Sequence, residues 1–167
     1  MAKIIFTFAI KILDCKKVMI KNATLLNLLK RVSVIIMPKR MIDTNMWIDG
    51  QVVDEFTKND ILLWLYLLTS PHTNICGVLK CSISMIAFES KLIKKEIIES
   101  LENLKTKHHL IKQNLEEEEI LILNWHKHNW SKSSKLLTSI QTSMETIKTQ
   151  EFKNYVSGLI ERYKTLI

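Results

Sequence analysis

Apolar and polar positions along this chain change their spacing several times, and each change marks an expected element. Between Ile61 and Leu68, apolar residues recur at helical spacing and form one broad face. Thr57 stands before this run, and Asp60 stands three residues after Thr57. This spacing is typical of a helix N-cap whose partner carboxylate bonds back to the backbone of the cap residue. Proline disfavours helical angles at the residue before it. The pattern therefore predicts a helix from Thr57 to the residue before Pro71.

A short strand, two helices and a hairpin are expected to follow that helix. The pattern favours a strand over 77–81, helices over 82–90 and 94–106, and paired strands over 110–113 and 119–125. The helical residues expected to face inward are Met85, Ile86, Ile97, Ile98, Leu101 and Leu104, with Phe88 as a further candidate. Strand, helix, helix and hairpin is the order of a winged helix-turn-helix. We therefore expect a mostly α (α+β) protein with a β-hairpin wing and C-terminal helices.

The last part of the chain carries two amphipathic stripes. Ser131 can cap a helix over 132–149, and a second stripe covers 152–163. Amphipathic helices must bury their apolar faces against the domain, each other or a second chain. We expect a winged-helix domain over 37–131, followed by a C-terminal helical segment over 132–167.

Apolar residues in the segment 1–36 follow neither a regular helical nor a regular strand spacing. Two interpretations stay open: an extension that comes from an upstream start codon, or an ordinary helix around 23–34 that packs on the domain. The apolar run 4–10 is too short to span a membrane, and it lacks a clear signal-peptide cleavage site. The three cysteines can all be thiols, as in a reducing cytoplasm. We expect a cytoplasmic protein with no membrane partner.

Charge is unevenly distributed along the chain. The net charge of +7 and the isoelectric point of about 9.3 favour a nucleic-acid partner. Residues 1–36 hold seven basic groups and one acidic group, and residues 124–167 hold seven basic and three acidic groups. Residues 37–123 hold ten basic and thirteen acidic groups, so the expected winged helix is acidic overall. The basic character is therefore expected in the flanks.

The helix expected over 94–106 is the one that would enter a major groove in a helix-turn-helix protein. Lys91, Lys94 and Lys95 lie near its start and can hold phosphates, and Asn103 can face a groove. The glutamates of this helix oppose that interpretation, because each would approach phosphate with like charge.

Two further segments bear on a nucleic-acid interface. The acidic run 116–119 at the wing tip is expected to face water or a basic partner. Residues 124–132 form the densest aromatic and polar cluster, either a surface that stacks on bases or a strand end whose two tryptophans pack on the first helix. The usual burial of tryptophan favours the second interpretation. The candidate DNA contacts are Lys91, Lys94, Lys95, Lys127, Lys132 and Lys135.

No pattern in the sequence points to catalysis or to a bound metal. Cys76 and Cys81 are five residues apart, which does not match a zinc knuckle or finger. His126 and His128 would share one face of a strand, but core thiols and surface imidazoles are the favoured interpretation. We find no nucleophile with a base, no phosphate loop and no paired-carboxylate motif. We expect a protein that is not an enzyme and that needs no cofactor.

Four short runs carry a family resemblance through their order: Arg40-Met41-Ile42-Asp43, Leu65-Tyr66-Leu67-Leu68-Thr69, Cys76-Gly77-Val78-Leu79 and Ile122-Leu123-Asn124-Trp125-His126-Lys127-His128-Asn129. With them, residues 39–131 resemble the N-terminal domain of phage replisome-organiser proteins, which are related to the DnaD-like primosomal proteins of low-GC Gram-positive bacteria. The resemblance implies a winged helix that binds DNA, self-associates and recruits host helicase-loading proteins at a replication origin. In DnaD-like relatives, the winged helix serves largely for oligomerisation.

The chain departs from that family pattern in two places. Only about 36 residues follow Ser131, whereas the family often has a second, DNA-binding helical domain there. Ser90-Lys91 and His108-His109 occupy turns where a glycine is usual. We expect a DNA replication initiation protein of phage or prophage type that acts through DNA contact and self-association. Two alternatives stay open: a winged-helix transcriptional regulator, and a protein–protein interaction module that does not bind DNA.

Overall fold

The structure, a computed structural model, describes residues 40–131 and 133–164. These residues belong to one folded unit, Lys39–Ile167. The expectations for residues 1–36 and for Lys132 lie outside the described residues. No helix in the described part of the chain is long and apolar enough to span a membrane.

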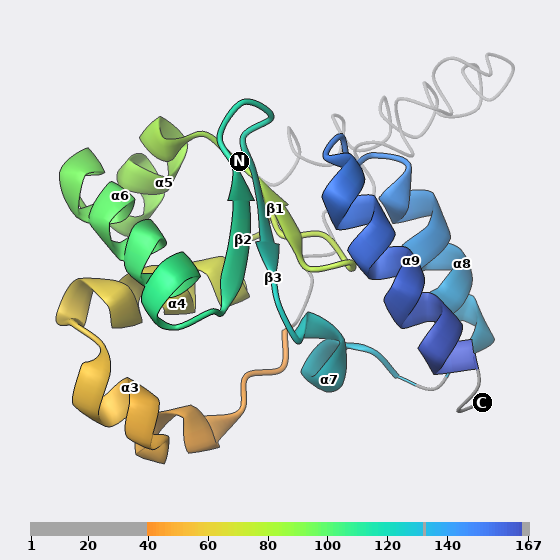
Figure 1. Ribbon diagram of the computed structural model, residues 1–167, viewed down its shortest axis with the longest axis horizontal. Helices are drawn as coiled ribbons and strands as arrows, with labels where there is room; N and C mark the ends of the chain where they lie inside the picture. The colour runs from red at the N-terminus through yellow and green to blue at the C-terminus, as the bar shows by residue number, and fades with distance from the viewer. Residues whose placement is uncertain (1–39, 132, 165–167) are drawn as a thin grey trace, which may run out of the picture. The chain divides into compact units, whose positions relative to one another are not determined.

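The fold is mostly helical α+β, with a small three-stranded antiparallel sheet between helices (Figure 1). The helical elements are η1 (Thr44–Ile48), α3 (Gly50–Glu55), α4 (Lys58–Thr69), α5 (Ile83–Ser90), α6 (Lys94–Glu102), the π-helical turn η2 (Asn103–Lys107), α7 (Trp125–Asn129), α8 (Ser134–Met144) and α9 (Gln150–Lys164). The strands are β1 (Val78–Lys80), β2 (Ile111–Asn114) and β3 (Glu119–Ile122). Helices α4, α5 and α6 lie on one side of the sheet, and α8 and α9 lie on the other.

The N-terminal cap predicted for the first long helix is confirmed. The Thr57 hydroxyl accepts the N–H of Asp60 at 3.1 Å, and the Asp60 carboxylate accepts the N–H of Thr57 at 2.9 Å. The Asn103 side chain also donates to both Asp60 oxygens, at 3.3 Å each. Asn103 therefore ties the end of α6 to the start of α4, and the expectation that it faces a groove is wrong.

The predicted pairing of the two later strands is confirmed. β2 and β3 are antiparallel neighbours, with Ile111 opposite Ile122 and Gln113 opposite Ile120. β1 pairs with the other edge of β3, which gives the order β1-β3-β2. The last strand ends at Ile122 rather than at Trp125, because Asn124 turns the backbone with a φ of 59° and α7 begins at the next residue.

The core surrounds β3, whose four residues are all buried. Leu63, Leu67, Ile97 and Leu101 belong to the same apolar cluster as Leu121, and so do Ile140, Phe152, Val156 and Ile160 from α8 and α9. A strand that is covered on both faces is expected to be apolar at every position, as at 120–122. The two C-terminal helices therefore bury their apolar faces against the sheet and against each other, which was one of the arrangements expected for them.

Several helical residues expected to face inward do so, and three do not. Ile86, Ile97, Leu101 and Leu104 are buried, but Met85, Phe88 and Ile98 are 44%, 70% and 55% exposed. The buried apolar stripe follows positions i, i+4 and i+7 from Ile97, along α6 and into η2. Ile98 is turned about 100° from Ile97 around the helix axis, so it falls outside that stripe.

The expectation that the acidic run 116–119 faces water or a basic partner is only partly right. Glu119 is 1% exposed, and its carboxylate accepts the backbone N–H groups of Lys148 at 2.8 Å and Thr149 at 2.9 Å. Glu117 forms an ion pair with Lys148 at 2.9 Å. The basic partner of this segment is therefore the connection between α8 and α9 of the same chain, while Glu116 and Glu118 stay exposed.

Candidate functional site

The turn between α5 and α6 presents the first group of candidate residues. Ser82 caps α5 by accepting the N–H of Met85 at 3.3 Å, and Glu96 accepts the N–H of Ile93 at 3.0 Å where α6 begins. Lys91 ends α5 in the left-handed conformation, with a φ of 65°. Glycine adopts this backbone conformation most readily, so a lysine there is unusual. His109 has the same kind of conformation, with a φ of 54°.

Lys91, Lys94 and Lys95 lie close together at this turn, and all three are exposed. Among the described residues, none of them has a carboxylate partner. The Lys91 ammonium lies 4.7 Å from the centroid of the Phe88 ring, so it is in cation–π contact. The turn therefore offers three positive charges to an external group.

The same turn carries exposed apolar side chains that the sequence pattern did not identify as surface residues. Phe88, Ile93 and Ile98 are 70%, 61% and 55% exposed. Leu115 at the tip of the hairpin is 64% exposed. The signal that could have separated Ile98 from the core is its place four residues after Lys94, on the face of α6 that also carries Glu102 and Lys105.

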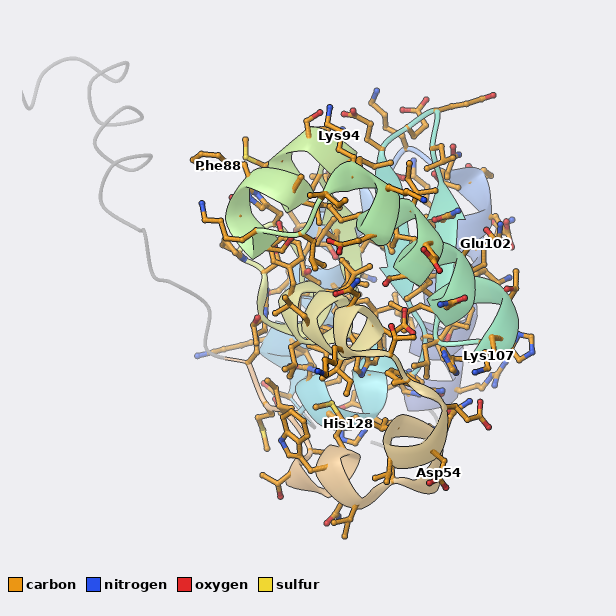
Figure 2. The ribbon with its side chains drawn as sticks, turned by 90° about the vertical axis from the view of Figure 1, so that its left-hand side faces the viewer. Asp54, Phe88, Lys94, Glu102, Lys107 and His128 are labelled. Carbon is orange, nitrogen blue, oxygen red and sulfur yellow. The ribbon has the colours of Figure 1, made fainter. Side chains whose placement is uncertain are left out.

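The remaining candidate lysines lie elsewhere. Lys127 is exposed on α7 and Lys135 is exposed on α8, while Lys132 is outside the described residues. Figure 2 shows Lys94 at one end of the described unit and His128, the neighbour of Lys127, toward the other. The structure therefore brings together Lys91, Lys94 and Lys95 and does not bring Lys127 to them.

The aromatic cluster that follows the hairpin is structural. Trp125 and Trp130 are 4% and 9% exposed, and both indole N–H groups donate to the carbonyl oxygen of Ile75, at 3.1 Å and 2.9 Å. Burial of the tryptophans agrees with the interpretation favoured from sequence. Their segment is the helix α7 rather than a strand end, and these bonds hold it to the loop before β1. Trp130 also packs edge-on against Tyr163, with ring centroids 5.7 Å apart.

The titratable side chains considered for a metal site are dispersed. Cys76 is buried, and burial raises the pKa of its thiol to about 11. His126 and His128 lie two residues apart on a helix, so they do not share the face that a strand would give them. His108 is buried rather than a surface imidazole. Within residues 40–131 and 133–164, no three His, Cys, Asp or Glu side chains are grouped so that they could hold a metal ion.

No protein-family model, curated protein sequence or solved structure significantly matches this chain.

Proposed function

We propose that this chain is a winged helix-turn-helix protein of phage-type or prophage-type DNA replication initiation, which contacts DNA and self-associates during primosome assembly. The observation that carries the proposal is the chain topology. A helix, a short strand, two helices and a hairpin follow one another over 58–122, and the first strand pairs with the second strand of the hairpin. This is the arrangement in which a winged helix presents α6 and the β2–β3 wing to a partner.

In this proposal, the residues that contact DNA are Lys91, Lys94 and Lys95. They lie at the start of α6, where helix N-termini and nearby lysines commonly hold phosphates. Glu99 and Glu102 on the same helix, and Glu116 and Glu118 on the wing, limit the net positive charge of this surface. The contact is therefore expected to be weak, non-specific and sensitive to salt.

Charge reversal at the start of α6 tests this contact. The double variant Lys94→Glu/Lys95→Glu should weaken binding to a duplex and flatten its dependence on salt concentration, measured by gel shift at two salt concentrations. Lys58→Glu is the matched control, because Lys58 is also exposed at a helix start but lies at the end of α4 that contacts Asn103 rather than the α6 turn. Equal duplex binding by the wild type and the double variant would remove α6 from the DNA interface.

A second candidate function is a protein–protein docking module that does not bind DNA. The observation in its favour is the exposure of Phe88, Ile93, Ile98 and Leu115 beside the three lysines, since neighbouring exposed apolar side chains mark interaction sites. Such a surface also suits self-association or contact with a helicase-loading protein of the host. Light scattering alongside the gel shift separates the candidates: oligomers with salt-sensitive DNA binding support the initiation protein, and oligomers without DNA binding support the module. A sharp sequence preference would instead indicate a transcriptional regulator.

A further inference from the structure

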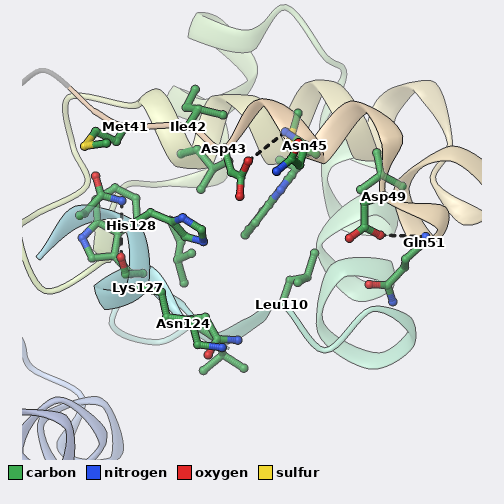
Figure 3. Close-up of a pocket in the computed structure, with 18 residues that line it drawn as sticks. Met41, Ile42, Asp43, Asn45, Asp49, Gln51, Leu110, Asn124, Lys127 and His128 are labelled. Carbon is green, nitrogen blue, oxygen red and sulfur yellow. Dashed lines mark hydrogen bonds between the residues drawn. The ribbon is translucent and has the colours of Figure 1, made fainter.

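A pocket of about 300 Å³ opens between residues 41–52, α4, the sheet and α7, at a distance from the α5–α6 turn (Figure 3). Its floor is apolar and includes Trp64, Leu68 and Leu123. Trp64 is only 9% exposed, and its indole N–H has no hydrogen-bond acceptor among the described residues. The volume is at the lower end of the range for small-molecule sites, which is about 300–1,000 Å³.

Side-chain amides are unusually frequent around this floor. Asn45, Gln51, Asn124 and Asn129 all line the pocket, from two parts of the chain that lie far apart in the sequence. Each carboxamide offers both a donor and an acceptor. Only Asn129 uses its amide in a side-chain hydrogen bond within the described residues, a long one of 3.5 Å to the carbonyl of Trp125. A ligand with donors and acceptors along one edge would therefore find partners here.

The basic side chains of the pocket lie apart from its outermost carboxylate. Figure 3 shows Lys127 and His128 on one side and Asp49 on the opposite side, with Asp43 between them. Asp43 and Asp49 are fixed in place because each accepts the backbone N–H two residues later, at 2.9 Å. Each of these carboxylates keeps a second oxygen for another donor. Lys127 has no carboxylate partner in the described part of the chain.

We propose that this pocket binds a nucleotide. The base lies on the apolar floor beside Trp64, its polar edge meets the carboxamides and the Asp43 carboxylate, and its phosphate meets Lys127 and His128. Proteins commonly recognise unpaired bases through stacking or apolar contact together with hydrogen bonds to the Watson–Crick edge. A purely apolar ligand would displace water from these exposed and half-buried amides and charges without offering them a new hydrogen-bond partner, which is costly.

The nucleotide can be free or part of a single strand, since both present the same base and phosphate. A base inside a duplex is stacked and cannot enter a pocket without being flipped out. The site is thus separate from the duplex contact proposed at Lys94, and neither depends on the other.

The test uses the full chain labelled with ¹⁵N, titrated with each of the four deoxynucleoside monophosphates and with a single-stranded deoxyadenylate hexamer. Saturable shifts are expected at the Trp64 indole N–H and at the side-chain amides of Asn45 and Asn124. If only the hexamer shifts these signals, the proposal stands and the source of the nucleotide is a single strand.

Two exposed lysines provide the variant and its control. Lys127→Ala should weaken binding of deoxyadenosine monophosphate about tenfold, the loss expected for one hydrogen bond to a charged group, and should leave binding of deoxyadenosine unchanged. Lys135→Ala, on α8 and outside the pocket, should change neither. The proposal is overturned if no nucleotide and no hexamer gives saturable shifts, if the shifts map away from the pocket, or if Lys127→Ala and Lys135→Ala behave alike.

Discussion

The buried carboxylate of Glu119, in the central strand, accepts the backbone N–H of Thr149 at 2.9 Å, one residue before α9 begins. It accepts the N–H of Lys148 as well, so one side chain satisfies two backbone donors ahead of that helix. Burial raises the pKa of Glu119, but the hydrogen bonds from Lys148 and Thr149 outweigh that effect and hold the pKa below its usual value. The carboxylate is thus ionised in the folded protein and fastens α9 to the sheet.

Neutralising this carboxylate should destabilise the fold. Glu119→Gln keeps the shape but replaces one acceptor oxygen by a donor group, so a backbone N–H loses its partner at a cost of about 1–3 kcal/mol. Because the folded pKa is depressed, the contribution of Glu119 is fully present above its unfolded pKa and is lost as the pH falls through the folded pKa. Urea unfolding at neutral and acidic pH measures both effects. Glu116→Gln, at an exposed position, is the control, and an equal effect of the two substitutions would contradict the assignment.

Alanine substitutions at Gly77 and at Gly158 should change the stability of the fold in opposite directions. Gly77 has a φ of 80°, and a Cβ built there would lie 2.5 Å from Cγ of Trp125. Gly77→Ala therefore combines backbone strain of about 1–3 kcal/mol with a clash against a buried side chain. Gly158 lies inside α9, and a Cβ there meets nothing within 4 Å among the described residues, so Gly158→Ala should stabilise by about 0.5–1 kcal/mol. Thermal unfolding of both variants checks the two signs, and destabilisation by Gly158→Ala would be the contrary result.

The buried imidazole of His108 should make the fold sensitive to mild acid. Its ring is fully buried and packs at a tilt of 38° against the Phe56 ring, with centroids 4.2 Å apart, and among the described residues neither ring nitrogen has a hydrogen-bond partner. Burial lowers the pKa of His108, and the charge of Lys107 lowers it further, against the opposing effects of Asp60 and Glu55. The unfolded chain then binds a proton more readily, so stability should decrease as the pH falls below about 6.5 and through the lower folded pKa.

A substitution at His108 separates the effect of its titration on stability from the effects of other titrating groups. His108→Phe should remove most of the loss of stability between about pH 7 and pH 5, measured by urea unfolding, because the titrating group is gone while an aromatic, slightly larger ring still fills the site. His109→Asn serves as the control, since His109 is exposed and asparagine tolerates its left-handed conformation. An unchanged pH profile in His108→Phe would show that another group carries the sensitivity.

The exposed apolar side chains of the α5–α6 turn should matter for association and not for folding. Phe88→Ser with Ile98→Ser is expected to lower the mass measured by light scattering, because it removes apolar area that self-association would bury. The unfolding free energy should change by less than about 0.5 kcal/mol, as is usual for surface positions. Leu62→Ser, at a 44% exposed position on α4, provides the matched comparison. If Leu62→Ser lowered the measured oligomer mass as much as the double variant does, the association surface would not be specific to the α5–α6 turn.

The sequence predicted features that depend on neighbouring residues and missed those that depend on distant ones. The cap of α4 is set by Thr57 and Asp60 alone, and the hairpin needs only two apolar runs and a polar connection, so both were predictable. Asn103 and Glu119 are residue types that usually lie on the surface, and their placement here depends on hydrogen-bond partners 43 and at least 29 positions away. The pocket has the same origin, since its amides come from segments that only the folded chain brings together.

The position of β3 has a consequence for how the molecule can be divided. Because side chains from α8 and α9 belong to the same apolar cluster as Leu121, a fragment that stops at residue 131 would expose one face of the sheet to solvent. Such a fragment is expected to aggregate or to unfold rather than to survive as a smaller domain. The sheet and the helices that pack on its two faces are therefore expected to unfold together, in a single cooperative transition.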